Sequence, residues 1–243
     1  AKAFNVTFTD KDGKIKHVWQ TSWGVSTRLI GGLIMAHSDD IGLVLPPSIA
    51  PFHVIIIPIW KTQEEKQTVL SEARKLKDRI GREAVSAKID ERDYVSPGFK
   101  FNEWEKKGVP IRLELGPRDI SQGQVVLVRR DSGEKKSVPS MEAQTAISVT
   151  LSDIQKSLFN RAELFCKTHS HHVANYEECK RILETNPGFV YAFWCGNSSC
   201  EQKVREETTA TIRCIPFDQP KEKGTCIVCG RDAAMQALFA KAY

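Results

Sequence analysis

The stretch SPGFKFNEWEKKGVPIRLELGPRD, residues 96–119, mixes aromatic, cationic and acidic side chains within a short span. Pro97-Gly98 predicts a turn at its start, Gly116-Pro117 predicts one near its end, and the alternation over residues 111–115 predicts a half-buried strand. Single-stranded RNA needs rings for base stacking, groups that pair with base edges, and cations for its backbone. The composition therefore fits an RNA-contacting surface, although a solvated loop followed by a strand explains it equally well.

Composition indicates a globular protein with one large or two modest domains. The chain has 243 residues, of which 41% are hydrophobic and 27% charged. Its most apolar run, residues 55–59, is too short to span a bilayer, and the N-terminus lacks the organisation of a secretory signal, so we expect no membrane partner and a cytoplasmic location. A net charge of +5 permits a polyanionic partner without identifying one.

The first 50 residues predict a hairpin, turning at Asp12-Gly13, and then a strand-to-helix segment. Residues 20–35 read QTSWGVSTRLIGGLIM, with the helix expected from Ser26 to about His37. Glycine in such a strand allows close approach of a ligand to the backbone, but it also suits plain strand-to-helix packing with Ser26 as the N-cap. Prolines between 46 and 51 indicate a domain boundary.

The following 100 residues predict an α/β layered domain, because strands and helices alternate. Residues 53–59 form a continuous β-branched run, which is typical of a central strand covered on both faces. A helix is expected from Lys61 to Arg82, capped by Thr62 with Glu65 and ended by Gly81. The other predicted strands are residues 85–89, 111–115, 125–129 and 135–138.

Helical periodicity dominates from Ser140 to about Glu184, with one apolar face predicted for residues 151, 154, 158, 162 and 166. The first helix of this region is expected to end in HisSerHisHis, residues 169–172. Adjacent positions on a helix point apart, so we interpret these histidines as an exposed polar turn in preference to a metal site.

Two cysteine pairs near the C-terminus predict a metal site. The motifs are WCGNSSC, with Cys195 and Cys200, and CIVCG, with Cys226 and Cys229. Each pair can wrap a tetrahedral Zn²⁺, and four thiolates leave no open position, so such a site would be structural. A redox role for the second pair is the alternative, but it does not explain the first pair.

Three of these segments resemble one protein family. Residues 97–119 look like the anticodon-domain segment of prolyl-tRNA synthetases of the eukaryotic and archaeal type. Residues 20–35 resemble the third signature motif of class II synthetases, and the cysteine pairs and final Tyr243 match the family's zinc-binding C-terminal domain. The resemblance implies the end of a class II antiparallel catalytic sheet (1–50), an α/β anticodon-binding domain with a mixed sheet (51–150) and a small α+β zinc domain (151–243).

The resemblance also implies a function: ATP-dependent activation of proline, with Mg²⁺ as the catalytic ion, and transfer to tRNA(Pro). The first two class II motifs are absent from the sequence, so we expect the chain alone to be inactive and the whole enzyme to dimerise through that missing part. A tRNA-binding scaffold module and a zinc-stabilised regulator are the alternatives. The implied site residues are Gln20, Ser26, Thr27 and Arg28 for ATP; Ser22, Trp23 and Gly24 for proline; and Lys100, Phe101, Glu105, Arg118 and Asp119 for the anticodon.

The genetic code specifies the chemistry required of the anticodon residues. Every proline anticodon contains two guanines, whose edges present an O6 acceptor beside N1 and N2 donors. Arg118 can donate to O6 and Asp119 can accept from N1 and N2, while Glu105 could accept from the second guanine. The alternative is that Arg118 and Asp119 simply pair with each other at a turn.

Overall fold

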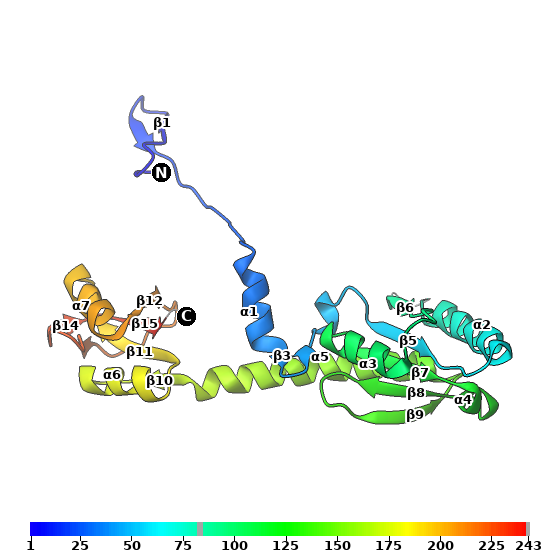
Figure 1. Cartoon of the computed structure of the whole chain (residues 1–243). Coiled ribbons are helices and arrows are strands. Elements are labelled where there is room, and N and C mark those ends of the chain that lie inside the picture. The colour runs from blue at the N-terminus through cyan, green and yellow to red at the C-terminus, as the bar shows by residue number, and fades with distance from the viewer. Residues whose placement is uncertain (82–84, 242–243) are drawn as a thin grey trace.

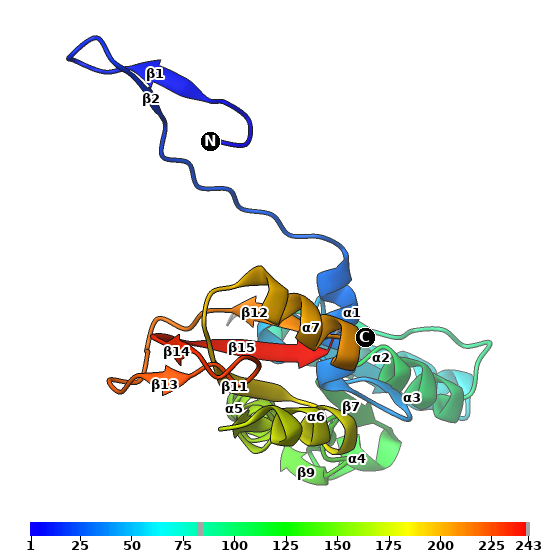
Figure 2. The same ribbon diagram turned by 90° about the vertical axis from the view of Figure 1, so that its left-hand side faces the viewer.

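The computed structural model describes residues 1–81 and 85–241. A separate N-terminal hairpin is followed by a middle unit, residues 38–158, and a C-terminal unit, residues 169–241 (Figure 1). Helix α5 (Ala143–Thr168) runs from one unit to the other, and the N-terminal hairpin stands away from both in two perpendicular views (Figures 1 and 2).

The N-terminal segment forms the predicted hairpin but not the predicted strand after it. Strands β1 (Thr7–Thr9) and β2 (Ile15–His17) are antiparallel, and Gly13 has the positive φ, +72°, that the turn requires. Residues 18–26 have no regular structure, because an isolated extended segment needs a neighbouring strand for its backbone hydrogen bonds and no described strand lies beside it. Helix α1 (Arg28–His37) follows and has no buried residue.

A mixed five-stranded sheet forms the centre of the middle unit. In spatial order its strands are β6 (Ala87–Ile89), β5 (Val54–Pro58), β7 (Ile111–Leu115), β8 (Gln124–Arg129) and β9 (Lys135–Pro139). Strand β5 is parallel to both neighbours, whereas β8 is antiparallel to β7 and β9. The parallel pairs require crossover connections, which contain α2 (Gln63–Ile80) and α3 (Pro97–Lys106).

Both faces of this sheet are covered, as the continuous apolar run of β5 predicts. Val54 and Ile56 pack in the cluster that includes α2 and α5, while Ile55 and Ile57 pack against Trp104 on α3. The four β5 residues are completely buried. The mixed α/β character expected from the sequence is therefore confirmed for this unit.

Helix α2 begins with the capping box that the sequence predicts. The Glu65 amide donates to Thr62 Oγ1 at 3.2 Å, and Glu65 Oε2 accepts from the Thr62 amide at 3.3 Å. Gly81 is the C-cap, as expected, and Arg82 lies outside the described residues.

The opening turn predicted at Pro97-Gly98 is wrong, because these residues form the first turn of α3. Ser96 Oγ accepts from the Phe99 amide, and proline suits the first helical position because its missing N–H needs no partner there. The half-buried pattern predicted for β7 is also wrong. Arg112 faces α3 and is only 7% exposed, because ion-pair partners surround its guanidinium.

Near the end of the stretch, Gly116-Pro117 begins a short helix, α4 (Pro117–Ser121), in place of an open turn. Asp119 Oδ2 accepts from the Gly116 amide at 2.8 Å, which satisfies one of the free N–H groups at the helix start. The chain therefore ends β7 and immediately turns through a capped helix.

Helix α5 is buried in the middle unit only as far as Leu158. Residues 159–168 are all exposed, so the predicted apolar face is buried through Leu158 but not at Ala162 and Cys166, because the helix leaves the sheet before it reaches them. None of the described helices combines the length and apolarity needed to cross a membrane.

The C-terminal unit contains a second mixed sheet, with helices α6 (Tyr176–Thr185) and α7 (Ser198–Thr208) packed against it. In spatial order its strands are β10 (Ser170–His172), β11 (Phe189–Trp194), β15 (Met235–Lys241) and β12 (Ala210–Cys214). The polar turn predicted at the histidines is wrong, since β10 pairs in parallel with β11, a distant partner in the sequence.

Three short elements complete the fold. They are the hairpin of β3 (Ser38–Asp39) and β4 (Gly42–Leu43), the 3₁₀ helix η1 (Pro47–Ile49), and the hairpin of β13 (Gly224–Thr225) and β14 (Asp232–Ala233).

Candidate nucleic-acid interface and metal centre

The carboxyl ends of the three parallel strands β6, β5 and β7 meet at one edge of the middle sheet, which we call the carboxyl edge. Trp60 follows β5, Asp90 follows β6, and α4 follows β7. A pocket of about 310 Å³ lies there, and its lining includes Trp60, Arg92, Tyr94 and Lys100. Ligands of open α/β sheets bind at this position, so the edge is a candidate binding site.

A buried network holds the edge together around Asp90, whose side chain is 2% exposed. Arg92 donates to both Asp90 carboxylate oxygens, at 2.8 and 2.6 Å, and Trp104 Nε1 donates at 2.8 Å. Burial raises the pKa of Asp90, but the bonds from Arg92 and Trp104 lower it further, to about 2. The carboxylate is therefore charged at neutral pH.

Lys100, a predicted anticodon residue, belongs to this network and not to the surface. It is 2% exposed, and its Nζ donates to the Asp90 carbonyl at 3.0 Å and lies 5.2 Å from the centre of the Trp60 ring. Burial lowers the pKa of Lys100. In this structure the Lys100 side chain is a buried part of the pocket wall.

Phe101 and Glu105 lie further along α3, where Arg112 contacts both. The Arg112 guanidinium lies 4.4 Å from the centre of the Phe101 ring and donates to Glu105 Oε1. Arg112 also donates to Glu114 at 3.0 Å. Helix α3 runs away from the carboxyl edge, so Glu105 lies toward the opposite end of the sheet from α4.

Arg118 and Asp119 lie at the carboxyl edge, in α4. Arg118 is exposed and Asp119 half-exposed. The described structure contains neither an ion pair nor a hydrogen bond between their side chains, and the Asp119 carboxylate caps α4 through Gly116. Of the five predicted anticodon residues, Lys100, Arg118 and Asp119 therefore share one edge, where only Arg118 is fully exposed.

The predicted anticodon residues omit three aromatic residues near the same edge, of which Phe99 belongs to the stretch that the sequence indicates for RNA contact. Trp60 lines the pocket, Tyr94 at its rim is 78% exposed, and Phe99 in the first turn of α3 is 54% exposed. Exposed rings beside an arginine fit base stacking. Trp60 follows the end of β5, whereas Tyr94 and Phe99 lie on the connection after β6, and these positions become informative only when the strand order is known.

The residues predicted for ATP and proline are not gathered into a site. Gln20 to Arg28 are all exposed, Trp23 is 93% exposed, and the segment before α1 is irregular. Helix α1 begins at Arg28, two residues later than expected, and its N-cap is Thr27 and not Ser26.

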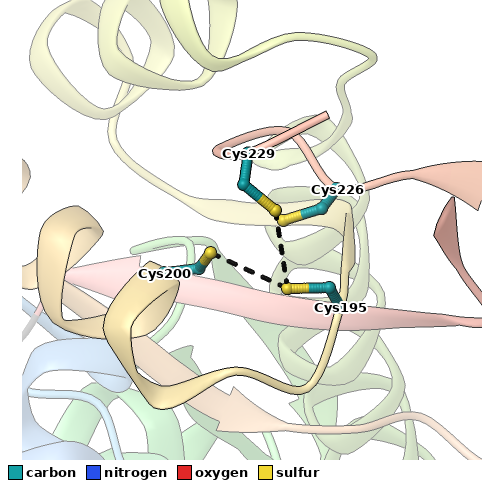
Figure 3. Close-up of side chains that lie close together, drawn as sticks. All are labelled: Cys195, Cys200, Cys226 and Cys229. Atoms are coloured by element: carbon teal, nitrogen blue, oxygen red, sulfur yellow. Dashed lines mark hydrogen bonds between the residues drawn. The ribbon is translucent and has the colours of Figure 1, made fainter. Parts of the chain in front are cut away.

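The four predicted metal ligands do converge. Cys195 and Cys200 come from the end of β11 and the start of α7, whereas Cys226 and Cys229 come from the loop between β13 and β14 (Figure 3). Their sulfur atoms all lie within 4.8 Å of one another, and Cys195 Sγ is 3.7 Å from those of both Cys200 and Cys229. These four thiols could hold a metal ion.

Glycine turns and one arginine shape the sulfur cluster. Gly196 and Gly230, which follow a cysteine in each motif, have φ values of +79° and +68°. Arg231 Nε donates to Cys229 Sγ at 3.4 Å, and this bond lowers the pKa of the Cys229 thiol to about 6. Burial instead raises the pKa of Cys200 to about 12.

Comparison with known proteins agrees with this arrangement. Residues 53–150 match the family model "Anticodon binding domain", and residues 176–243 match "Prolyl-tRNA synthetase, C-terminal". Three curated relatives are named proline–tRNA ligase. The one from Alkaliphilus oremlandii is 47% identical over 241 residues, which cover 99% of this chain and 49% of the relative. Those from Roseiflexus castenholzii and Flavobacterium johnsoniae are 47% and 46% identical over 246 and 243 residues; each match covers 100% of this chain, and they cover 51% and 49% of the relatives. The chain thus spans about half the length of these relatives. From these matches, the chain belongs to the prolyl-tRNA synthetase family and corresponds to its C-terminal region.

Proposed function

We propose that this chain is the C-terminal portion of a proline–tRNA ligase, which activates proline with ATP and Mg²⁺ and transfers it to tRNA(Pro). The observation that carries the proposal is similarity to proline–tRNA ligases along the whole chain, together with two family models in the matching order. We further propose a division into part of the catalytic domain (1–50), an anticodon-binding domain (51–150) and a zinc domain (151–243). A cytoplasmic location and a homodimer formed by the whole enzyme remain part of this proposal.

Residues of this chain would contribute to three tasks. Gln20, Ser26, Thr27 and Arg28 would bind ATP, and Ser22, Trp23 and Gly24 would contact proline, on one wall of a site completed by other residues. In the anticodon-binding domain, Arg118 and Asp119 would recognise a guanine, with Lys100, Phe101 and Glu105 supporting or extending that contact. The exposure of Arg118, Tyr94 and Phe99 supports recognition at the carboxyl edge.

For the cysteine cluster we propose a structural zinc ion. A tetrahedron of sulfurs about 2.3 Å from zinc has edges of about 3.8 Å. The two 3.7 Å separations at Cys195 fit that geometry, and thiolates are the ligands zinc prefers. Zinc bound by Cys195, Cys200, Cys226 and Cys229 would join β11, α7 and the β13–β14 hairpin. Metal analysis showing no zinc in protein purified without chelator would contradict this assignment.

Binding of anticodon stem-loops tests the recognition proposal. Arg118→Ala should weaken binding of a proline stem-loop, by about 1 to 3 kcal/mol if it loses one base-edge contact. It should hardly change binding of a variant in which that guanine is adenine. Asp119→Asn is the sharper change, because asparagine can still cap α4 but cannot replace the carboxylate toward a guanine.

The matched control is Lys203→Ala, which removes an exposed cation from α7 in the C-terminal unit. Because it touches no part of the carboxyl edge, both stem-loops should respond equally to this change. Equal losses for both stem-loops in the Arg118 and Asp119 variants would instead assign those residues to backbone attraction or to helix capping.

A non-catalytic tRNA-binding module is the second candidate for the isolated chain. The exposure of every residue from Gln20 to Arg28 favours it, because a nucleotide site needs more walls than this segment provides. Proline-dependent pyrophosphate exchange separates the two candidates. The isolated chain should show none while still binding tRNA(Pro).

A further inference from the structure

The β3–β4 hairpin is fastened to the last turn of α3 by one buried arginine. Arg130 donates to both carboxylate oxygens of Asp39, at 2.8 and 2.7 Å, and its Nε donates to the Glu105 carbonyl at 2.8 Å. The Arg130 side chain is only 5% exposed. A single guanidinium, 91 residues from Asp39 in the sequence, therefore joins the hairpin to α3.

Backbone contacts reinforce this junction. The Leu45 amide donates to the Gly108 carbonyl at 3.2 Å. A Cβ added to Gly42 would lie 2.5 Å from Lys106 Cα, and one added to Gly108 would lie 2.6 Å from Leu43 Cβ. Both glycines also have positive φ, +153° and +73°. The hairpin and the end of α3 consequently touch without an intervening side chain, and neither can shift independently by much.

The junction connects two segments with different proposed tasks. On one side, α1 begins at Arg28 and leads directly from His37 into β3 at Ser38. On the other side, α3 begins at the carboxyl edge, beside the pocket, and ends at Glu105 and Lys106 in the junction. The path from α1 through the hairpin to α3 therefore contains no free loop.

We propose that Arg130 is a positioning residue for tRNA charging. By holding the β3–β4 hairpin against α3, it fixes α1, which begins at the proposed ATP-binding residue Arg28, relative to the anticodon-binding edge. This inference rests on the proposed function. Binding of the anticodon increases the charging rate only if the acceptor end of the tRNA reaches the reaction centre at a defined distance and angle. Misplacement of the acceptor end therefore lowers the rate of transfer.

Arg130→Gln in the whole synthetase containing this chain tests the proposal. Three quantities are measured: proline-dependent pyrophosphate exchange without tRNA, affinity for the anticodon stem-loop, and kcat and KM for charging of tRNA(Pro). Exchange and stem-loop affinity should stay within about twofold, because neither requires both ends of the tRNA. The kcat for charging should fall by about 10- to 100-fold, the cost of a misplacement of roughly 1 Å.

A neighbouring arginine supplies the matched control. Arg129 donates to Asp131 at 3.0 and 2.9 Å, so it also makes a bidentate pair, but with a residue two positions along the chain and not across the junction. Arg129→Gln should leave charging within about twofold of wild type. Arg130→Lys should restore charging only in part, since an ammonium cannot reproduce the fork toward Asp39 and Glu105.

The outcomes separate the possible failures. Similar charging by the Arg129 and Arg130 variants would overturn the positioning role, as would pyrophosphate exchange that falls in step with charging, which indicates general damage to the fold. A loss confined to stem-loop affinity would assign Arg130 to recognition and also overturn it. If the wild-type enzyme neither binds nor charges tRNA(Pro), the proposed function itself has failed, whatever Arg130 does.

Discussion

Removing the Asp90 carboxylate should strongly destabilise the middle unit. In Asp90→Ala the Lys100 amine, 4.0 Å from Asp90 Oδ1 in a site that is 3% exposed, loses the carboxylate that faces it, and Trp104 Nε1 loses its acceptor. An unsatisfied buried donor costs about 1 to 3 kcal/mol. Because breaking a buried ion pair from one side costs about 3 to 5 kcal/mol in all, we expect a loss of that size in the free energy of unfolding.

The loss should depend on pH in a defined direction. The pKa of Asp90 falls from its ordinary value of 3.8 to about 2 on folding. A lowered carboxyl pKa stabilises the fold above the unfolded pKa, and this contribution disappears as the pH falls through the folded pKa. About 2 kcal/mol of wild-type stability should therefore be lost between about pH 4 and pH 2. Asp90→Asn should lack this part of the acid dependence.

Urea unfolding followed by the indole N–H resonance of Trp104 provides a local measurement in the middle unit. Asp93→Ala is the control, because Asp93 pairs with Lys66 at 2.7 Å but is 57% exposed, and it should hardly change the unfolding midpoint. Lys100→Met in the Asp90→Ala background should recover part of the loss by removing the stranded charge. Equal midpoints for the Asp90 and Asp93 variants would refute the buried-network argument.

Three further predictions concern the rest of the fold. Chelation of the proposed zinc ion should unfold the C-terminal unit and leave the middle unit folded. Amide exchange that rises in both units, or in neither, would contradict a structural ion confined to the cysteine cluster. Gly188→Ala would place a Cβ 2.1 Å from the His169 carbonyl oxygen and should lower the free energy of unfolding of the C-terminal unit by about 1 to 3 kcal/mol. The thermal midpoint of that unit should fall, and an unchanged midpoint would disprove the close contact. Leu158→Ala should lower the free energy of unfolding by about 2 to 5 kcal/mol, whereas Phe159→Ala, at a side chain that is 63% exposed, should change it by no more than about 0.5 kcal/mol. Similar urea midpoints for the two variants would place the end of the core elsewhere.

The sequence predicts best those features whose causes are local. The Thr62–Glu65 capping box is such a case, since both partners lie within one turn and the structure forms both bonds. The cysteine pairs are another, because their short spacing and following glycines already define each half of the cluster. The buried run of β5 is predictable because no polar residue interrupts it.

Other features depend on partners that lie in other helices or strands. Proline followed by glycine signals a turn and equally the first turn of a helix, so α3 was not distinguishable from a loop by local pattern. The burial of Lys100 depends on Asp90 at the end of another strand, and β10 exists only because β11 pairs with it. The place of Glu105 in an ion-pair network likewise requires knowledge that Arg112 lies beside α3.

The exposed part of α5 sets the rotational orientation of the C-terminal unit relative to the middle unit. Residues 159–168 continue the helix without contacting the middle sheet, so the units are joined by a rod and not by a flexible tether. Each residue of an α-helix advances the chain by about 1.5 Å and rotates it by about 100°. One residue inserted into this rod would swing the C-terminal unit to a different side of the middle unit, whereas an insertion of seven residues would nearly restore its azimuth about 10 Å further away. The length of this segment therefore determines the relative rotation of the two units as well as the distance between them.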